Sequence, residues 1–476
     1  MRGAIAAGHP ATAAVGARVL ADGGNAVDAV VAAAFASWIA ESPLTGPGGG
    51  GFMLVHRASD RSTRVLDFFV TVPGGGADPA AMETIDVDFS SETKTPYLIG
   101  SASVAVPGVP AGLATAWKRF GTKPWAELVE PAIALAHDGV DVTGPQDYLH
   151  RLLESILCFQ PEGKELYSLG IGDRFRIPAL GDTLRRIADD GVASLYTGEL
   201  ARAISETAPH ISPADLAGYR VIRRRAVSTP FRGFEFTSNP PPSSGGVLIA
   251  YGLRLLDNWG RFDARAVIDA MQEQAAARRD GSFLRSLYRG GLAHKLMGPV
   301  DAPSNTTHIS VVDERGNAVA LTCSTGAGSG VFVPGTGIHL NNMLGESDLA
   351  GHHKPGERLT SMMAPSICFE RGRPRLVVGS AGSSRLRGAI MQVVVNVLAH
   401  GLEVKDAVER PRIHWEDDVV HAEGGADVSG LGSTELTQWP KLNLFFGGAN
   451  AVEIRPDGEL AAAGDPRRGG ASVVVQ

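Results

Sequence analysis

The stretch from residue 306 to residue 321 constrains the fold of this chain most. Two hydroxyl residues, Thr306 and Thr307, open an alternating apolar run that ends at Asp313. The following residues, Asp-Glu-Arg-Gly-Asn over 313–317, are typical of a tight turn, and a second apolar run covers 318–321. The pattern predicts a β-hairpin whose first strand begins at a threonine hydroxyl.

Threonine hydroxyls are poor nucleophiles unless a base lies beside them. One economical base is the α-amine of the same residue, which becomes available when the preceding peptide bond is cut. That cut would make Thr306 a new N-terminus. By propensity alone, however, Thr306 and Thr307 are ordinary β-branched strand formers. The rest of the chain must decide between the two interpretations.

Several separate stretches accompany the hairpin and span nearly the whole chain. They are residues 25–29, 48–52, 104–112, 240–246, 305–313, 334–342 and 465–470. Together they resemble the γ-glutamyltranspeptidase family of N-terminal-nucleophile hydrolases. The resemblance implies a single precursor that cuts itself before a threonine, after which the freed threonine attacks a γ-glutamyl amide.

The resemblance also implies an architecture. It predicts an α+β fold, the four-layer αββα sandwich of the N-terminal-nucleophile hydrolases, with two central sheets between helical layers. We expect one composite domain over residues 1–476, cut between Asn305 and Thr306. The large subunit (1–305) and the small subunit (306–476), which carries the nucleophile, would stay associated.

Local patterns agree with a mixed fold. Residues 10–38 place apolar side chains at three- and four-residue steps around a turn at 22–25, which predicts two packed helices. Residues 65–70 predict a strand, and residues 386–398 predict a helix that follows a glycine-rich turn. Residues 145–215 have a mostly helical pattern.

Four residues match the family's catalytic positions. Thr306 matches the nucleophile, and before the cut its Oγ would attack the carbonyl of Asn305 in an N to O acyl shift. Ser324 stands where the family commonly has a second threonine bonded to the nucleophile, although serine also commonly bonds nearby backbone. Gly382 and Ser383 match the backbone donors of the oxyanion hole. We expect serine to be tolerated at 383 if its φ is negative.

The substrate-binding positions depart further from the family. Relatives usually carry an arginine where this chain has Phe69, and that guanidinium clamps the α-carboxylate of glutamate. Gly326 replaces an asparagine, and Glu346 is the natural match to an aspartate that could receive an ammonium. Thr360 and Ser361 match hydroxyls that hold the substrate carboxylate. We therefore expect ordinary γ-glutamyl compounds to be poor substrates.

Two tempting features have simpler interpretations. The four glycines at 48–51 lack the Lys-Ser/Thr ending of a phosphate-binding loop, and they favour close backbone packing beside the nucleophile. His308 lies in an alternating strand, where a packed or hydrogen-bonded histidine is more common than a catalytic base.

Composition excludes several other classes of protein. With 44 basic and 51 acidic residues the net charge is −7, and the short arginine run at 223–225 is interpreted as a solvated edge, so we expect no nucleic-acid partner. Three distant cysteines suit neither a disulfide framework nor a zinc site. No signal peptide or apolar span is evident, which predicts a cytoplasmic protein without a membrane partner. No metal or organic cofactor is implied, and the expected partner is a small-molecule substrate.

Three functions remain open at this point. The first is cleavage of an acyl (amide-type) bond through a threonine acyl enzyme, outside ordinary γ-glutamyl substrates. The second is carbon–carbon bond cleavage in a natural-product pathway of the alkylproline or antibiotic type, as in some γ-glutamyltranspeptidase-like proteins. The third is an uncut, non-catalytic scaffold, against which the retained Thr306, Ser324 and Gly382 argue.

Overall fold

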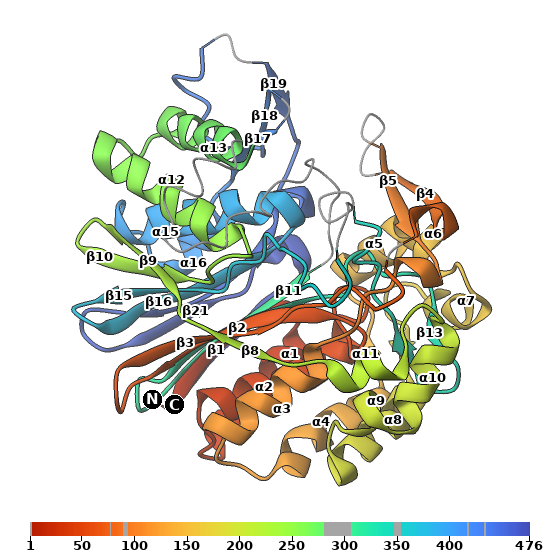
Figure 1. The fold of residues 1–476 in the computed structure, drawn as a ribbon. Coiled ribbons are helices and arrows are strands. Elements are labelled where there is room, and N and C mark those ends of the chain that lie inside the picture. Colours follow the sequence, from red (N-terminus) through yellow and green to blue (C-terminus); the bar gives the residue numbers. More distant parts are fainter. Residues whose placement is uncertain are drawn as a thin grey trace.

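The computed structural model describes residues 2–76, 78–88, 94–279, 306–346, 354–416, 418–432 and 435–476. Asn305, the residue expected before the cut, lies outside the described residues, whereas Thr306 lies inside them. Within these ranges two β-sheets stack face to face and helices cover both outer faces (Figure 1). The expected four-layer αββα sandwich is confirmed.

The first sheet contains the predicted hairpin. β11 pairs antiparallel with β12, from Thr306 opposite Ser324 to Val312 opposite Ala318, so the hairpin is confirmed and its second strand runs three residues beyond the predicted end. β12 in turn pairs with β2, where Ser324 lies opposite Gly50. Over the described residues the sheet has seven strands, in the order β22 (Ala471–Val475), β1 (Gly3–Ala7), β11 (Thr306–Asp313), β12 (Ala318–Ser324), β2 (Gly50–Arg57), β3 (Ser62–Phe68) and β8 (Ile222–Arg224).

The second sheet is also antiparallel throughout. Its described strands follow the order β21 (Leu460–Ala463), β20 (Gly448–Ile454), β16 (Arg373–Ala381), β15 (Ser366–Glu370), β10 (Phe234–Ser238) and β9 (Val227–Phe231). β16 and β20 pack across β11 of the first sheet. The C-terminal part of the chain therefore brings its own strands over the predicted nucleophile strand.

Alternate side chains of β11 face opposite layers. Ile309 and Val311 belong to the core that the first sheet shares with the helices beneath it, whereas Val312 belongs to the core between the sheets. Because strand side chains alternate, Thr307 faces the helices and Thr306 faces the second sheet. The two adjacent threonines therefore lie in different environments.

The helices α1 (Pro10–Ala21) and α2 (Ala26–Ala40) lie under the first sheet and confirm the predicted helix pair. Every residue of α2 is buried, and its many alanines let it pack closely against both α1 and the sheet. Asn25 caps α2, and the carboxylate of Asp28 accepts a hydrogen bond from the backbone N–H of Asn25 in a capping box. These contacts fix the start of α2 and hence the position of Glu41 at its end.

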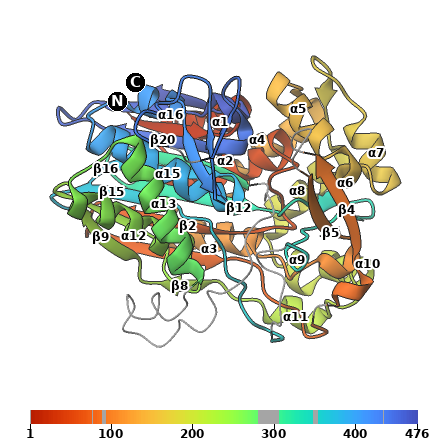
Figure 2. The ribbon, with the colours of Figure 1, turned by 90° about the horizontal axis from the view of Figure 1, so that it is seen from above.

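The remaining helices fall into two groups. On the second sheet lie α12 (Gly245–Trp259), α13 (Ala264–Arg279), α15 (Leu386–Leu398) and α16 (Val404–Glu409), and α15 has the predicted bounds. A helical flank lies at one side of the sandwich beside the hairpin of β4 (Glu83–Asp88) and β5 (Lys94–Ile99) (Figure 2). It contains α5 (Gly144–Leu152), α6 (Glu154–Leu157), α7 (Pro161–Tyr167), α8 (Pro178–Asp190), α9 (Ser194–Thr197), α10 (Glu199–Thr207) and α11 (Pro213–Gly218), next to α3 (Val109–Phe120) and α4 (Trp125–Asp138).

One strand is shorter than predicted. β3 ends at Phe68, so Phe69 and Val70 lie just past the strand and not within it. The backbone N–H of Phe69 donates to the Asp67 carboxylate at 3.1 Å, which turns the chain away from the sheet. The strand expected over 65–70 is therefore wrong at its C-terminal end.

Candidate active site

Thr306 is the first residue of β11 and is 1% exposed. It lies opposite Ser324, the last residue of β12, so both hydroxyl residues stand at the same end of the first sheet. Ser324 Oγ also accepts a 2.8 Å hydrogen bond from the backbone N–H of Gly326. The structure therefore brings the predicted nucleophile and its predicted partner residue together.

The glycines at 48–51 pack against the end of β12, where Gly50 lies opposite Ser324. A Cβ at Gly49 would lie 2.3 Å from the carbonyl oxygen of Ser324, and one at Gly51 would lie 2.5 Å from that of Thr322. Real side chains do not approach backbone this closely, so only glycine allows the loop to pack here. The interpretation of close backbone packing is confirmed.

His308 is a packed residue of the inter-sheet layer. Its ring nitrogens contact the hydroxyls of Thr322 at 2.8 Å and Ser310 at 2.9 Å, and the ring lies against Gly379 of β16. Burial lowers the pKa of His308 to about 3, so the ring is neutral at physiological pH. The prediction of a hydrogen-bonded, non-basic histidine is confirmed.

Gly382 and Ser383 form the turn that follows β16. Gly382 has φ 121° and Ser383 has φ 55°. The condition given for tolerating serine at 383, a negative φ, is not met, because the chain enters the short helix Ser383–Arg385 through a left-handed residue. A Cβ at Gly382 would lie 2.8 Å from Cα of Gly447, so glycine is required at 382 on steric grounds as well.

Glu41, at the C-terminal end of α2, is a buried carboxyl next to the nucleophile strand. Its Oε1 accepts a 2.7 Å hydrogen bond from Thr12, and its Oε2 accepts one from the hydroxyl of Thr307. Burial raises the pKa of Glu41 to about 7, while the two hydroxyls and the charge of Arg468 oppose the rise. A carboxyl that titrates near neutral pH thus lies one residue from Thr306.

Arg468 connects Glu41 with the glycine turn. Its Nη2 stands 3.8 Å from the place a Cβ would take at Gly382, and its charge acts on Glu41. Burial, and after it the charge of the nearby Arg385, lower the pKa of Arg468 to about 10. The start of β11 and the turn after β16 therefore lie at the same edge of the sandwich.

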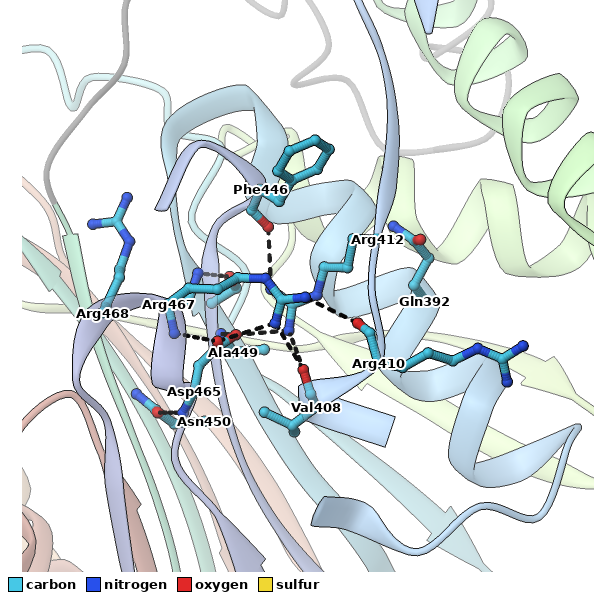
Figure 3. A network of polar contacts seen from close by, with 12 residues as sticks. Gln392, Val408, Arg410, Arg412, Phe446, Ala449, Asn450, Asp465, Arg467 and Arg468 are labelled. Atoms are coloured by element: carbon cyan, nitrogen blue, oxygen red, sulfur yellow. Dashed lines mark hydrogen bonds and ion pairs between the residues drawn. The ribbon is translucent and has the colours of Figure 1, made fainter. Parts of the chain in front are cut away.

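A buried ion network lies next to Arg468 in the chain (Figure 3). Arg412 donates to Asp465 at 2.7 Å, and Arg467 donates to the same carboxylate at 3.2 Å and also to Glu423. Such paired and hydrogen-bonded charges are costly to break once buried. The network ties Asp465 and Arg467, at the start of the segment 465–470, to Arg412 and Glu423.

Phe69 occupies a closed apolar position. Its side chain is 1% exposed and stacks on Phe52 with ring centroids 5.5 Å apart, in the core between the sheets. Its carbonyl oxygen accepts hydrogen bonds from the Tyr219 hydroxyl at 2.7 Å and from Arg358. Phe69 and Phe52 together form an aromatic wall in the core between the sheets.

The other predicted substrate positions are Glu346, Thr360 and Ser361. Glu346 is buried, and its Oε1 stands 2.6 Å from the place of a Cβ at Gly326, close to Ser324. Ser361 Oγ accepts a 3.0 Å hydrogen bond from the backbone of Met363. Thr360 is half-buried and follows Leu359, whose N–H donates to the carbonyl of Val70.

No group of His, Cys, Asp and Glu side chains suited to a metal ion occurs among the described residues. Within the same part of the chain, no helix has both the length and the apolar composition of a membrane span.

Two residues of this region were not predicted. Glu41 and Arg468 interact with residues that are distant in the chain. The residues next to them in the sequence do not indicate these interactions. The signal that could have indicated Glu41 is a carboxylate directly after the run over residues 29–40, which is apolar except for Ser37, because charged residues are seldom fully buried without partners.

Comparisons with known proteins agree with this geometry. The profile of the family described as gamma-glutamyltranspeptidase matches residues 12–285 and 264–475. The glutathione hydrolase proenzyme of Escherichia coli is 31% identical over 98% of this chain and 90% of its own length. The acylase ACY 1 proenzyme of Pseudomonas sp. strain SE83 is also 31% identical, over 100% of this chain and 94% of its length.

The solved structure of a cephalosporin acylase from Bacillus halodurans has the same fold. Its TM-score is 0.83, with 24% sequence identity, and the match covers 99% of this chain and 95% of that chain. The fold is thus the αββα fold of the N-terminal-nucleophile hydrolases. The chain belongs to the γ-glutamyltranspeptidase family, whose members similar to it over their full length are hydrolase and transferase proenzymes.

Proposed function

We propose that this protein is a self-processing hydrolase in which Thr306 cleaves an acyl bond, of amide type, in substrates other than ordinary γ-glutamyl compounds. The observation that carries the proposal is the position of Thr306. It starts a buried strand, faces the second sheet, and stands opposite the hydroxyl residue Ser324. These features suit a threonine that is both the site of the cut and the nucleophile.

The proposed reaction uses one hydroxyl twice. In the precursor, Thr306 Oγ attacks the carbonyl carbon of Asn305, and the peptide nitrogen leaves as the amine of Thr306; water then hydrolyses the ester. In the processed enzyme that amine accepts the hydroxyl proton, and Oγ attacks the substrate carbonyl; the substrate's C–N bond then breaks, the leaving amine takes the proton, and an acyl enzyme remains. Water releases the acid and regenerates Thr306. The two resulting chains, 1–305 and 306–476, remain associated through the first sheet, because β1 and β2 flank the β11–β12 hairpin.

The backbone donors of the oxyanion hole are proposed at Gly382 and Ser383. The turn lies at the Thr306 edge of the sandwich, and Arg468 stands beside it. Donors aimed at a developing oxyanion contribute about 3 to 4 kcal/mol each to transition-state stabilisation. Glu346, Thr360 and Ser361 are proposed to contact the polar part of the substrate.

The closed apolar position of Phe69 supports the proposed substrate preference. A guanidinium bound to a carboxylate contributes about 1.5 to 3 kcal/mol per hydrogen bond, and the aromatic wall of Phe69 and Phe52 offers none. A loss of 3 to 4 kcal/mol lowers kcat/KM by roughly 10² to 10³. We expect the acyl group next to this wall to be uncharged or flat.

Three p-nitroanilides test the preference. Butyryl-p-nitroanilide is neutral, glutaryl-p-nitroanilide adds a carboxylate, and γ-glutamyl-p-nitroanilide adds a carboxylate and an ammonium. We expect kcat/KM to be highest for the neutral compound and lowest for the γ-glutamyl compound, and Thr306→Ala to abolish all three activities. Phe69→Arg should raise the γ-glutamyl rate relative to the neutral one, whereas Phe69→Leu should not. A wild-type preference for the γ-glutamyl compound would contradict the proposal.

A second candidate reaction is carbon–carbon bond cleavage in a natural-product pathway. The same observation favours it, since the Phe69 wall suits a substrate whose scissile carbonyl is attached to carbon and not to a charged amino acid. Mass spectrometry of products from paired amide and ketone analogues distinguishes the two reactions. Cleavage of the ketone alone would replace the amide proposal, and cleavage of the amide alone would eliminate the second candidate.

A further inference from the structure

A cleft of about 680 Å³ opens at the end of the sandwich away from Thr306. β2 runs from Gly50, beside Ser324, to His56, which lines the cleft. Six residues of strand span about 20 Å. The cleft therefore is separate from the candidate active site, and its lining includes residues of the β2–β3, β9–β10 and β15–β16 hairpins, whose strands lie on the left in Figure 1.

The cleft is strongly cationic. Arg61, Arg64, Arg225 and Arg371 line it together with a single acidic residue, Glu235. Among the described residues, no carboxylate lies within ion-pair distance of any of these four arginines. In a chain with net charge −7, this concentration of unpaired positive charge is a local feature.

Two of the arginines occupy positions that their backbone disfavours. Arg61 has φ 52° and Arg371 has φ 50°, in the β2–β3 and β15–β16 turns. Glycine and asparagine are the residues that adopt this region readily. Arginine is a poor choice for the backbone conformation of these two turns. Its occurrence in both therefore indicates a role of the guanidinium side chain.

A third hairpin turn provides the contrast. Arg232, in the β9–β10 turn, has φ 52° as well, but its guanidinium lies 5.3 Å from the ring centroid of Phe262. That cation–π contact gives Arg232 a local partner outside the cleft. Arg61 and Arg371 have no such aromatic partner among the described residues.

The arginine run at 223–225 contributes one residue to the cleft. Arg224 pairs with the buried carboxylate of Asp67 at 2.6 Å, so the interpretation of the run as a solvated edge is wrong for this residue. Arg225, its neighbour, lines the cleft. His56 and Phe369, in edge-to-face contact at 4.9 Å, contribute ring surface to the lining.

We propose that this cleft binds a small molecule that carries two or more oxyanion groups, of the phosphate or carboxylate type. Guanidinium groups bind both oxyanions through paired N–H donors, and several of them around one cleft select for multiple charges. The volume is in the range of small-molecule sites. The ligand would bind remotely from Thr306 and independently of the proposed hydrolase chemistry.

Isothermal titration at constant ionic strength tests the proposal on the full-length protein. The probes are inorganic pyrophosphate, citrate and, as a monovalent control, acetate. The double variant Arg61→Asn/Arg371→Asn removes two cleft charges, and asparagine keeps the turn conformation, so the fold should persist. Arg232→Asn is the matched control, because it removes an arginine with the same φ outside the cleft.

We expect pyrophosphate or citrate to bind at least tenfold more tightly than acetate. The double variant should lose at least tenfold in affinity, and Arg232→Asn should lose less than twofold. Tighter binding of pyrophosphate would identify a phosphate ligand, and tighter binding of citrate a polycarboxylate. Absence of binding by both, or equal affinity in wild type and the double variant, would overturn the proposal. Neither result bears on the cut before Thr306.

Discussion

Replacement of Glu41 by glutamine should remove a pH-dependent loss of stability. Glu41 is fully buried against Thr12 and Thr307, and burial raises its pKa from an ordinary 4.5 to about 7. A raised carboxyl pKa stabilises the fold while the group is protonated. That contribution is complete below pH 4.5 and is lost as the pH rises through 7.

The size of the effect follows from the two pKa values. Between pH 5 and pH 8 the ionisation of Glu41 should destabilise the folded chain by about 2.5 kcal/mol, because one pKa unit corresponds to about 1.4 kcal/mol. A chain of 476 residues unfolds with an entropy of about 1 kcal/mol/K near its midpoint. The expected change in Tm is therefore about 2 to 3 °C.

The assay is thermal unfolding at pH 5, 6, 7 and 8. The two proteins compared are Thr306→Ala and the double variant Thr306→Ala/Glu41→Gln, both of which should be uncut chains. Glu41→Gln should have a Tm close to that of its parent at pH 5 and about 2 to 3 °C above it at pH 8. Comparing the two proteins at each pH cancels the titration of all other groups. Parallel Tm curves over this range would refute the raised pKa and the assigned burial of the charge.

Two further predictions concern the structure around the turn. Asp465→Asn removes the carboxylate that pairs with two buried arginines. It should lower the free energy of unfolding by about 3 to 5 kcal/mol. The Tm should fall accordingly, whereas the exposed control Asp427→Asn should keep the wild-type Tm. Gly382→Ala should lower turnover of the best p-nitroanilide by roughly 10² to 10³, because the new methyl group collides with neighbouring backbone. Gly458→Ala, at a positive φ with open space, should leave that rate unchanged; equal rates in the two variants would argue against the proposed hole.

Local sequence patterns were sufficient to predict those parts of the structure that depend on residues close together in the chain. The hairpin of Thr306 follows from alternation and turn residues, and the close packing of the glycines at 48–51 follows from the absence of Cβ atoms. The helices of residues 10–40 follow from apolar spacing and from the capping residues Asn25 and Asp28.

Features that depend on distant parts of the chain could not be predicted. The hydrogen bond between Glu41 and Thr307 joins residues 266 positions apart, so no local pattern indicates it. The left-handed φ of Ser383 arises where β16 must turn into a helix beside Gly447. Likewise, the sequence shows that residue 69 is a phenylalanine, but only the fold shows that it stacks on Phe52 in the core between the sheets.

The N-terminal sequence of the purified protein tests the central claim most directly. Denaturing mass spectrometry of wild type should detect two chains, one of which begins at Thr306, and Thr306→Ala should yield only the intact chain. Thr307→Ala is the matched control, because it removes the adjacent hydroxyl that faces Glu41 and keeps the proposed nucleophile; it should still be cut before Thr306. A single uncut chain in wild type, or two chains in Thr306→Ala, would contradict the account.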